Sequence, residues 1–138
     1  MADDDLEDLT KALKRFSDEL PMASKNFADN KVEEFLNLVK PRTPVDTGNL
    51  REHWECRSFV STGDLMLLIS NNVEYASWVE YGHIQHPGQY VPKINARLKA
   101  SFVNGKYMMT RSINDILTNV EKDYENEISN LWRRCGLE

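Results

Sequence analysis

Hydrophobic residues near the start of the chain recur at steps of three and four, the spacing of one face of an α-helix. They are Leu6, Leu9, Leu13, Phe16 and Leu20. Pro21 removes an amide donor, so we expect this helix either to kink or to stop near Glu19 and restart. A second stripe predicts helix as far as Lys40, because Pro41 follows; it consists of Ala28, Val32, Phe35, Leu36 and Val39.

The hydrophobic period changes to two after residue 52. Trp54, Cys56, Ser58 and Val60 alternate with the residues between them, and an apolar run follows at residues 65–69. A loop at residues 61–64, built around Gly63, separates the two segments, so the pattern predicts a β-hairpin. Asn71-Asn72 ends its second strand.

The segment after the hairpin alternates between regular and turn-rich stretches. Residues 75–81 are aromatic-rich and favour a short helix closed by Gly82, with another strand as the alternative. The sequence GHIQHPG at residues 82–88 is turn-rich, so we expect a mobile loop at residues 82–92. Residues 98–103 can add a strand.

The last third of the chain predicts a long helix. Asn104-Gly105 is a turn signal, and apolar residues then recur at steps of three, four and seven. These residues are Ile113, Ile116, Leu117, Val120, Tyr124, Ile128, Leu131 and Trp132. Gly136 stands where a C-terminal cap is expected.

This order predicts an α+β fold with a long bent N-terminal helix, a small antiparallel sheet containing the hairpin, and a long C-terminal helix packed on the sheet. We expect one domain over residues 1–138, with a flexible acidic tip at residues 1–8. A sheet of three or four strands with so few helices leaves faces uncovered. Oligomerisation would cover them.

Composition narrows the choice of partners. The net charge is −5, and Asp3, Asp4, Asp5, Glu7 and Asp8 form an acidic cluster. This balance argues against a general affinity for nucleic acid or anionic membrane, although a local basic face stays open. The two cysteines, Cys56 and Cys135, are expected to be reduced thiols in a cytoplasm. The chain shows neither a membrane-span pattern nor a signal-peptide pattern.

The histidines and cysteines do not form a complete metal or catalytic pattern in the sequence. His83 and His86, with Glu80 three residues before His83 and His53 as a more distant candidate, give an incomplete zinc pattern, so we interpret them as ordinary loop histidines and expect no metal or cofactor. Neither cysteine lies at a nucleophile elbow: we expect Cys56 to be a small buried hydrophobe and Cys135 a free surface thiol. We therefore expect no enzymatic activity. The aromatic set fits core packing or a subunit interface; it is Trp54, Tyr75, Trp78, Tyr81 and Tyr90.

The stretch PRTPVDTGNLR at residues 41–51 reads as a rigid corner. Its prolines force the preceding residues toward extended geometry. Asp46 can accept hydrogen bonds from amides two or three residues on, assisted by Thr47. Gly48 permits a positive φ, or simply a close approach of the backbone. Arg51 then leaves the turn where its guanidinium can meet a carboxylate, a carbonyl cluster or a partner chain.

Three motifs in order resemble one phage family. They are PVDTGNLR at 44–51, NVEYASWVEYG at 72–82 and VNGKYMM at 103–109, with the pair Leu20-Pro21 upstream. The chain resembles the gene-product-ten-like family of phage Hong Kong 97, whose members are neck, head–tail joining or tail-completion proteins. The resemblance implies fold and interface roles for Val45, Asp46, Thr47, Gly48, Leu50, Arg51, Tyr75, Ala76, Val79, Glu80, Gly82 and Gly105, to which the aromatic reading adds Trp78.

The resemblance also implies a function. It is that of a non-enzymatic virion protein that forms a ring or joins rings at the head–tail interface. The implied partners are copies of itself, a tail terminator, and a connector or head-completion protein. The implied location is the virion, and the host cytoplasm during assembly. A negative net charge suits a place beside the DNA channel, since it would not hold the passing phosphates.

Two functions from other classes remain as alternatives. One is a small nucleic-acid-binding factor that uses Arg57, Lys93, Arg97, Lys99 and Lys106. The other is a metal-dependent hydrolase at His83 and His86.

Overall fold

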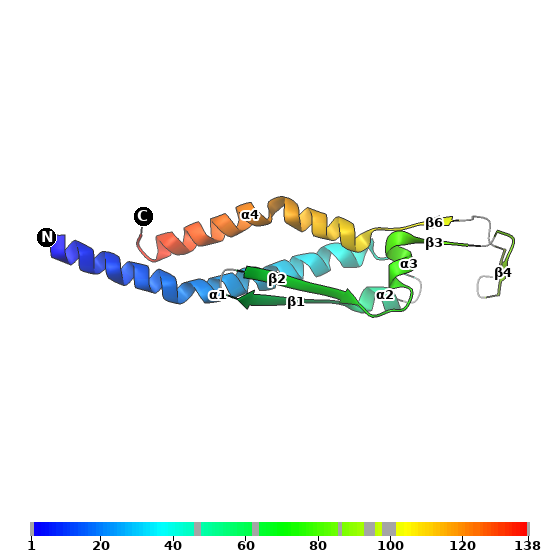
Figure 1. Cartoon of the computed structure of the whole chain (residues 1–138), viewed down its shortest axis with the longest axis horizontal. Helices are drawn as coiled ribbons and strands as arrows, with labels where there is room; N and C mark the ends of the chain where they lie inside the picture. The colour runs from blue at the N-terminus through cyan, green and yellow to red at the C-terminus, as the bar shows by residue number, and fades with distance from the viewer. Residues whose placement is uncertain are drawn as a thin grey trace.

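The computed structural model describes residues 2–45, 48–61, 64–85, 87–92, 96–97 and 102–137. Its elements are α1 (Ala2–Arg42), α2 (Asn49–Glu52), β1 (Trp54–Ser61), β2 (Asp64–Asn71), α3 (Ala76–Tyr81), β3 (Gly82–Ile84), β4 (Tyr90–Val91), β5 (Ala96–Arg97), β6 (Phe102–Asn104) and α4 (Met108–Arg134). Helices α1 and α4 lie side by side along an elongated molecule, the β1–β2 hairpin lies along α1, and β3 and β6 extend from one end (Figure 1). The predicted α+β class is confirmed.

Helix α1 passes through Pro21 without a break, so the predicted long bent helix is confirmed and the alternative, a stop near Glu19, is wrong. Figure 1 shows it as one continuous helix that bends along its course. A proline removes only one amide donor, and a long helix packed along its length tolerates that loss. The helix also passes Pro41 and ends at Arg42, two residues beyond the predicted end at Lys40. Thr43 closes the last turn, since its hydroxyl donates to the Val39 carbonyl at 2.7 Å.

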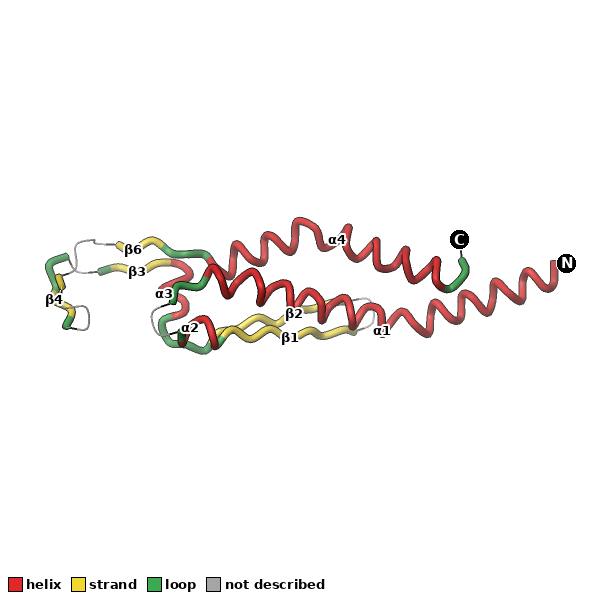
Figure 2. The backbone as a smooth tube through the Cα atoms, turned by 180° about the vertical axis from the view of Figure 1, so that it is seen from behind, coloured by secondary structure: helices red, strands yellow, loops and turns green. Residues whose placement is uncertain are grey.

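The described strands pair only in twos, and every pair is antiparallel. The predicted hairpin is confirmed, with Trp54 opposite Asn71 and Ser61 opposite Asp64; Gly63 lies outside the described residues. Strand β3 pairs with β6, and β4 with β5. The expected sheet of three or four strands is therefore wrong for the described residues. Figure 2 shows the separation of the pairs: β1 and β2 lie along α1, whereas β3 and β6 extend from one end of the molecule.

Four local predictions have different outcomes. The short aromatic helix is confirmed as α3, closed by Gly82 with a φ of 88°. The predicted loop at residues 82–92 contains the short strands β3 and β4, and its mobility stays a prediction. The predicted strand at residues 98–103 is met by β6 at its end, while residues 98–101 lie outside the description. Residues 2–8, predicted as a flexible tip, stand in the first turns of α1, and their flexibility stays a prediction.

The main core lies where α1, α2, β1 and α4 meet. Its buried members are Phe35, Val39, Leu50, Trp54, Met108 and Ile116. Burying one such large side chain stabilises the fold by about 1.5–3 kcal/mol. The start of α4 therefore joins α1 and the hairpin in one cluster, which fixes the end of the molecule that carries the sequence motifs.

The C-terminal end of α4 is closed as its sequence predicts. Gly136 has a φ of 80°. Its amide donates to the Arg133 carbonyl at 2.9 Å, and the Leu137 amide donates to the Trp132 carbonyl at 3.2 Å. This pair of bonds is the Schellman motif, which satisfies carbonyls that the helix itself leaves open.

Candidate functional site

The corner after α1 is held by hydrogen bonds to Thr43. This residue is 1% exposed. Its hydroxyl receives the indole N–H of Trp54 at 2.8 Å. Its carbonyl receives Nη2 of Arg51 at 3.1 Å. Of the partners left open for the Arg51 guanidinium, the structure therefore shows a carbonyl of its own chain, so Arg51 fastens the end of α1 to α2.

Gly48 has a φ of 81°, which confirms the predicted positive φ. It precedes α2, a single turn that places Leu50 in the core with 3% of its surface exposed. Asp46 and Thr47, predicted to make the turn, lie outside the described residues. Sequence reasoning missed α2 because one turn with a single apolar residue has no period to detect.

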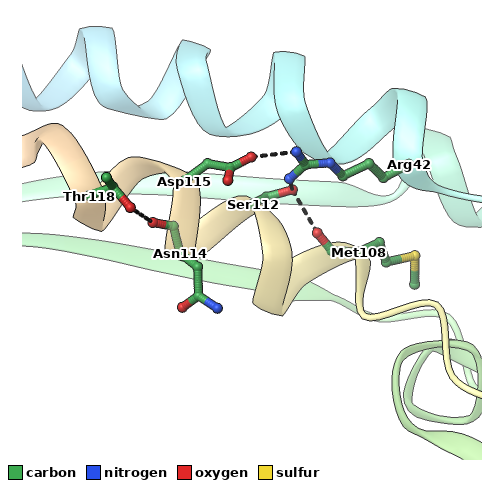
Figure 3. A network of polar contacts seen from close by, with 6 residues as sticks. All are labelled: Arg42, Met108, Ser112, Asn114, Asp115 and Thr118. Atoms are coloured by element: carbon green, nitrogen blue, oxygen red, sulfur yellow. Dashed lines mark hydrogen bonds and ion pairs between the residues drawn. The ribbon is translucent and has the colours of Figure 1, made fainter.

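Arg42 and Asn71 are two corner residues whose contacts the sequence did not indicate. Arg42 leaves the last turn of α1 and reaches α4 (Figure 3): Nη1 donates to the Ser112 hydroxyl at 3.2 Å, and Nη2 pairs with Asp115. Asn71 donates to the Leu50 carbonyl at 2.8 Å. The basic last turn of α1 was the one available signal for Arg42, because cations are favoured at helix C-termini. Together these contacts tie α1, the corner and α4 into one unit.

Glu80 caps α4 from another helix. It is 3% exposed, and its carboxylate receives the amides of Met109 at 2.7 Å and Thr110 at 3.1 Å. The Thr110 hydroxyl donates to it as well, at 3.0 Å. The N-cap residue of α4, Tyr107, supplies no side-chain cap. An acid at a helix N-terminus satisfies free amides and complements the helix dipole, so Glu80 replaces the missing cap.

Gly82 and Gly105 allow two backbone segments to cross at this cap. A Cβ on Gly105 would collide with the Glu80 carbonyl oxygen and lie 2.6 Å from the Tyr81 carbonyl carbon. A Cβ on Gly82 would collide with the Val103 carbonyl oxygen. The Tyr107 amide donates to the Glu80 carbonyl at 3.0 Å across the same crossing. Both glycines are therefore required by close approach of the backbone.

The aromatic residues divide between core and surface. Trp54 is 7% exposed and packs edge-on against Phe35, with ring centroids 6.0 Å apart. Tyr75 precedes α3 and is 40% exposed, while Trp78 is 59% exposed and stacks on His83. Of the two roles expected for the aromatic residues, core packing is confirmed for Trp54. An interface role for the others stays a prediction.

The histidines of the metal alternative do not converge within the part of the chain that the structure describes. Nδ1 of His53 lies 2.6 Å from the Asn49 carbonyl. His83 lies on β3, and His86 is outside the description. No group of three or more His, Cys, Asp or Glu residues that could hold a metal occurs among the described residues. Those residues also contain no helix with the length and apolar character needed to cross a bilayer.

The cysteines depart in part from expectation. Both are free, and Cys135 is 5% exposed, so its predicted surface position is wrong. The end of α4 packs against α1 there, with Sγ 3.9 Å from a Glu19 carboxylate oxygen. Cys56 is half-buried, and burial raises the pKa of its thiol. A raised pKa lowers the thiolate fraction and hence its reactivity.

The basic residues of the nucleic-acid alternative are spread over the molecule. Arg57 lies on the exposed side of β1, and Arg97 and Lys106 are exposed near the β3–β6 end. Arg97 donates to the Gly88 carbonyl at 2.9 Å. Lys93 and Lys99 lie outside the described residues.

These contacts define a class of protein: an elongated α+β structural protein whose best-built polar groups hold segments of its own chain in fixed positions. The profile of the HK97-gp10-like family of bacteriophage tail components matches residues 7–82, more than half of the chain. The chain belongs to this family and is a tail-associated structural protein of a bacteriophage. The match contains the corner and α3, while the third motif, at residues 103–109, lies beyond it. Searches of curated proteins and of solved structures found no match.

Proposed function

We propose that this protein acts at the head–tail interface of the virion, as a neck or tail-completion subunit that assembles into a ring and contacts neighbouring virion proteins. Its proposed partners are copies of itself, a tail terminator, and a connector or head-completion protein. Its role is structural and non-enzymatic. It is synthesised in the host cytoplasm and incorporated there.

The observation that carries this proposal is the amount of surface left open. The chain exposes 10,081 Å² at a mass of 16.0 kDa. A compact monomer of that mass exposes about 7,400 Å², so the excess is about 2,700 Å². A standard protein–protein interface takes about 800 Å² from each partner. The excess is therefore sufficient for the two neighbours that each subunit of a ring requires.

The hairpin shows the same shortage of internal cover. Leu65 to Ile69 form a continuous apolar run, which is typical of a strand buried on both faces. Only one face of β2 lies toward α1, and on the other face Met66 and Leu68 are 60% and 55% exposed. Phe59, opposite Met66 on β1, is 50% exposed. A two-stranded hairpin with an open apolar face is marginal alone, which supports burial in an assembly.

The test is complementation of a phage from which the gene has been deleted. We expect electron micrographs of the deletion lysate to show separate heads and tails, and the wild-type gene to restore joined particles. Arg51→Ala should restore them poorly, because losing a charged hydrogen bond at the corner costs about 1.5–3 kcal/mol. Lys122→Ala, at an exposed position on α4, is the matched control. Normal joined particles without the gene would remove the proposal.

A basic stretch of the sequence favours a second candidate, a small nucleic-acid-binding factor. From Tyr81 to Asn114 the sequence contains five Lys or Arg residues and no Asp or Glu. Binding of an oligonucleotide that weakens steeply as salt is added would support this function. An absence of binding at low salt would remove it.

A further inference from the structure

The N-terminal part of α1 carries an apolar seam that the rest of the chain does not cover. Hydrophobic positions alternate in steps of three and four, as in a coiled-coil seam; they are Leu6, Leu9, Leu13, Phe16, Leu20, Ala23 and Phe27. Helix α4 covers the later positions, since Phe16 packs on Trp132 and Phe27 on Tyr124 with ring centroids 5.1 and 5.0 Å apart. The seam therefore begins before the interface between α1 and α4 and continues into it.

Helix α4 ends at Arg134, and the seam before Phe16 is left open. Leu6, Leu9 and Leu13 are 61%, 47% and 44% exposed. We call residues 2–13 the arm; it extends about 18 Å beyond the covered part of α1 at 1.5 Å per residue. The arm is acidic at its tip, because its first five charged residues are Asp3, Asp4, Asp5, Glu7 and Asp8.

The opposite end of the molecule carries a second exposed apolar surface. We call it the distal surface; it consists of Tyr81, Ile84, Phe102 and Tyr107, which are 56%, 81%, 50% and 45% exposed. Ile84 and Phe102 are opposite one another on β3 and β6, and the rings of Tyr81 and Tyr107 meet edge-on at 6.3 Å. The surface is rigid at its base, because Glu80, Gly82 and Gly105 fix the crossing beneath it.

The distal surface is bordered by positive charge. Lys106 and Arg111 flank Tyr107 in the sequence, and both are exposed. Arg97 on β5 is exposed at the same end. The two uncovered apolar surfaces therefore carry opposite charges and lie at opposite ends of the molecule (Figure 1).

We infer that the arm of one copy docks on the distal surface of a second copy, with the arm leucines on the exposed aromatics and the acidic tip beside Lys106 and Arg111. This inference rests on the self-assembly in the proposed function and names the two surfaces that meet. Charge complementarity selects a second copy, and the excess of exposed area is large enough for such a contact on each side.

The geometry requires the contact to be between copies. Helix α1, which includes the arm, has 41 residues. It therefore spans about 60 Å from the tip of the arm to its C-terminal end. One copy therefore cannot fold its arm onto its own distal surface. Because two different surfaces meet, the contact is heterologous, and such contacts close into rings or extend as filaments.

The decisive experiment exchanges the charges of the two surfaces. One variant carries Asp3→Lys, Asp4→Lys and Asp5→Lys, which turns the summed charge of the arm's five acidic positions from −5 to +1, and the other carries Lys106→Glu and Arg111→Glu. Sedimentation velocity at low salt should show association of the wild type and, for each variant alone, an association weaker by about tenfold or more, since like charges then face each other. An equimolar mixture should regain association, because each variant's arm then meets a surface of opposite charge.

Two controls match the changes in net charge. Glu121→Lys with Glu125→Lys and Glu127→Lys matches the first variant, and Lys40→Glu with Lys122→Glu matches the second; all five positions are exposed and lie outside both surfaces. Both controls should associate as the wild type does. Circular dichroism of every protein verifies the helix content.

Three results would overturn the inference. They are a wild type that stays monomeric at low salt, variants that associate as well as the wild type, and a mixture that fails to regain association. A loss of oligonucleotide binding in the Lys106→Glu, Arg111→Glu variant with unchanged self-association would assign the basic end to nucleic acid instead.

Phage complementation separates this inference from the proposed function. If both charge variants restore joined particles fully while the deletion does not, the subunit works at the head–tail interface through other surfaces, and only the inference fails. If the deletion leaves joined particles normal while the mixture regains association, the contact between copies stands and the proposed function fails.

Discussion

Glu80 shows how a single charged side chain can hold two elements in register. It belongs to α3 in sequence, yet its carboxylate satisfies the first free amides of α4. The neighbouring crossing of Gly82 and Gly105 brings the two helices close enough for that contact. The motif NVEYASWVEYG is thus explained at its end by one cap and one close approach.

Replacing Glu80 by Ala should lower the free energy of unfolding by about 2 kcal/mol, because buried amides lose a charged acceptor. Urea denaturation followed by circular dichroism measures the change. Glu80→Gln should lose less, since an amide oxygen still accepts. Glu74→Ala, at an exposed position before α3, is the control and should change little; equal losses in Glu74→Ala and Glu80→Ala would contradict the cap.

From the sequence, Glu80, Gly82 and Gly105 were expected to be fold and interface determinants, but the contacts that they make were not predicted. Gly48 was predictable because a corner between helix and strand needs a positive φ, and it has one. The cap made by Glu80 was not predicted, and Glu80 was considered as a metal ligand instead. Its capping partners lie 29 and 30 residues away, and no short motif encodes that distance. Arg42 and Asn71 were missed for the same reason.

At the scale of elements, α1 and α4 are joined by a buried charge as well as by apolar packing. Lys31 is 7% exposed, and its Nζ donates to Glu34 at 2.8 Å and to Asp123 at 2.6 Å. Burial by itself lowers the pKa of Lys31, but the hydrogen bonds to Asp123 and Glu34 outweigh burial and raise it. The ammonium is therefore held between the two helices in its charged form.

The stability that Lys31 contributes should be lost in alkali. Because its pKa is higher in the folded protein, the contribution is complete below the unfolded value of about 10.4 and disappears as the pH rises through the folded value. Urea unfolding between neutral pH and pH 12 would show it as a difference between wild type and Lys31→Met. At neutral pH the difference should be about 1 kcal/mol, since both carboxylates keep contact with water. A difference that stays constant or grows with pH would refute this role.

The long elements were predictable and the short ones were not, for a physical reason. Helix α1, the hairpin and α4 repeat their apolar period several times, so the pattern is redundant. The pairing of β3 with β6 involves three residues on each strand and depends on the glycine crossing, which leaves no period in the sequence. The alternative of a stop near Glu19 was wrong because a lost amide donor at Pro21 is a local cost, whereas packing along α1 acts over its whole length.

At the scale of the whole molecule, the fold separates a built centre from two uncovered ends. The corner, the Arg42 network and the Glu80 cap all lie where α1, the hairpin and α4 meet. The arm and the distal surface extend from this centre in opposite directions (Figure 1). This separation means that the ends can be altered without loss of the core, which allows assembly and folding to be measured apart.

The arm leucines provide that measurement. Leu6→Ser with Leu9→Ser should leave the thermal midpoint unchanged within about 2 °C, because exposed side chains contribute little to folding. The same variant should weaken self-association, since both leucines belong to the docking seam. Phe16→Ala, one step further along the seam, should instead lower the free energy of unfolding by about 1–1.5 kcal/mol, because that half-buried ring packs on Trp132. Calorimetry measures the stability of the two variants, and sedimentation measures their self-association. If the leucine pair destabilised the fold as much as Phe16→Ala does, the arm would belong to the core and this division would be wrong.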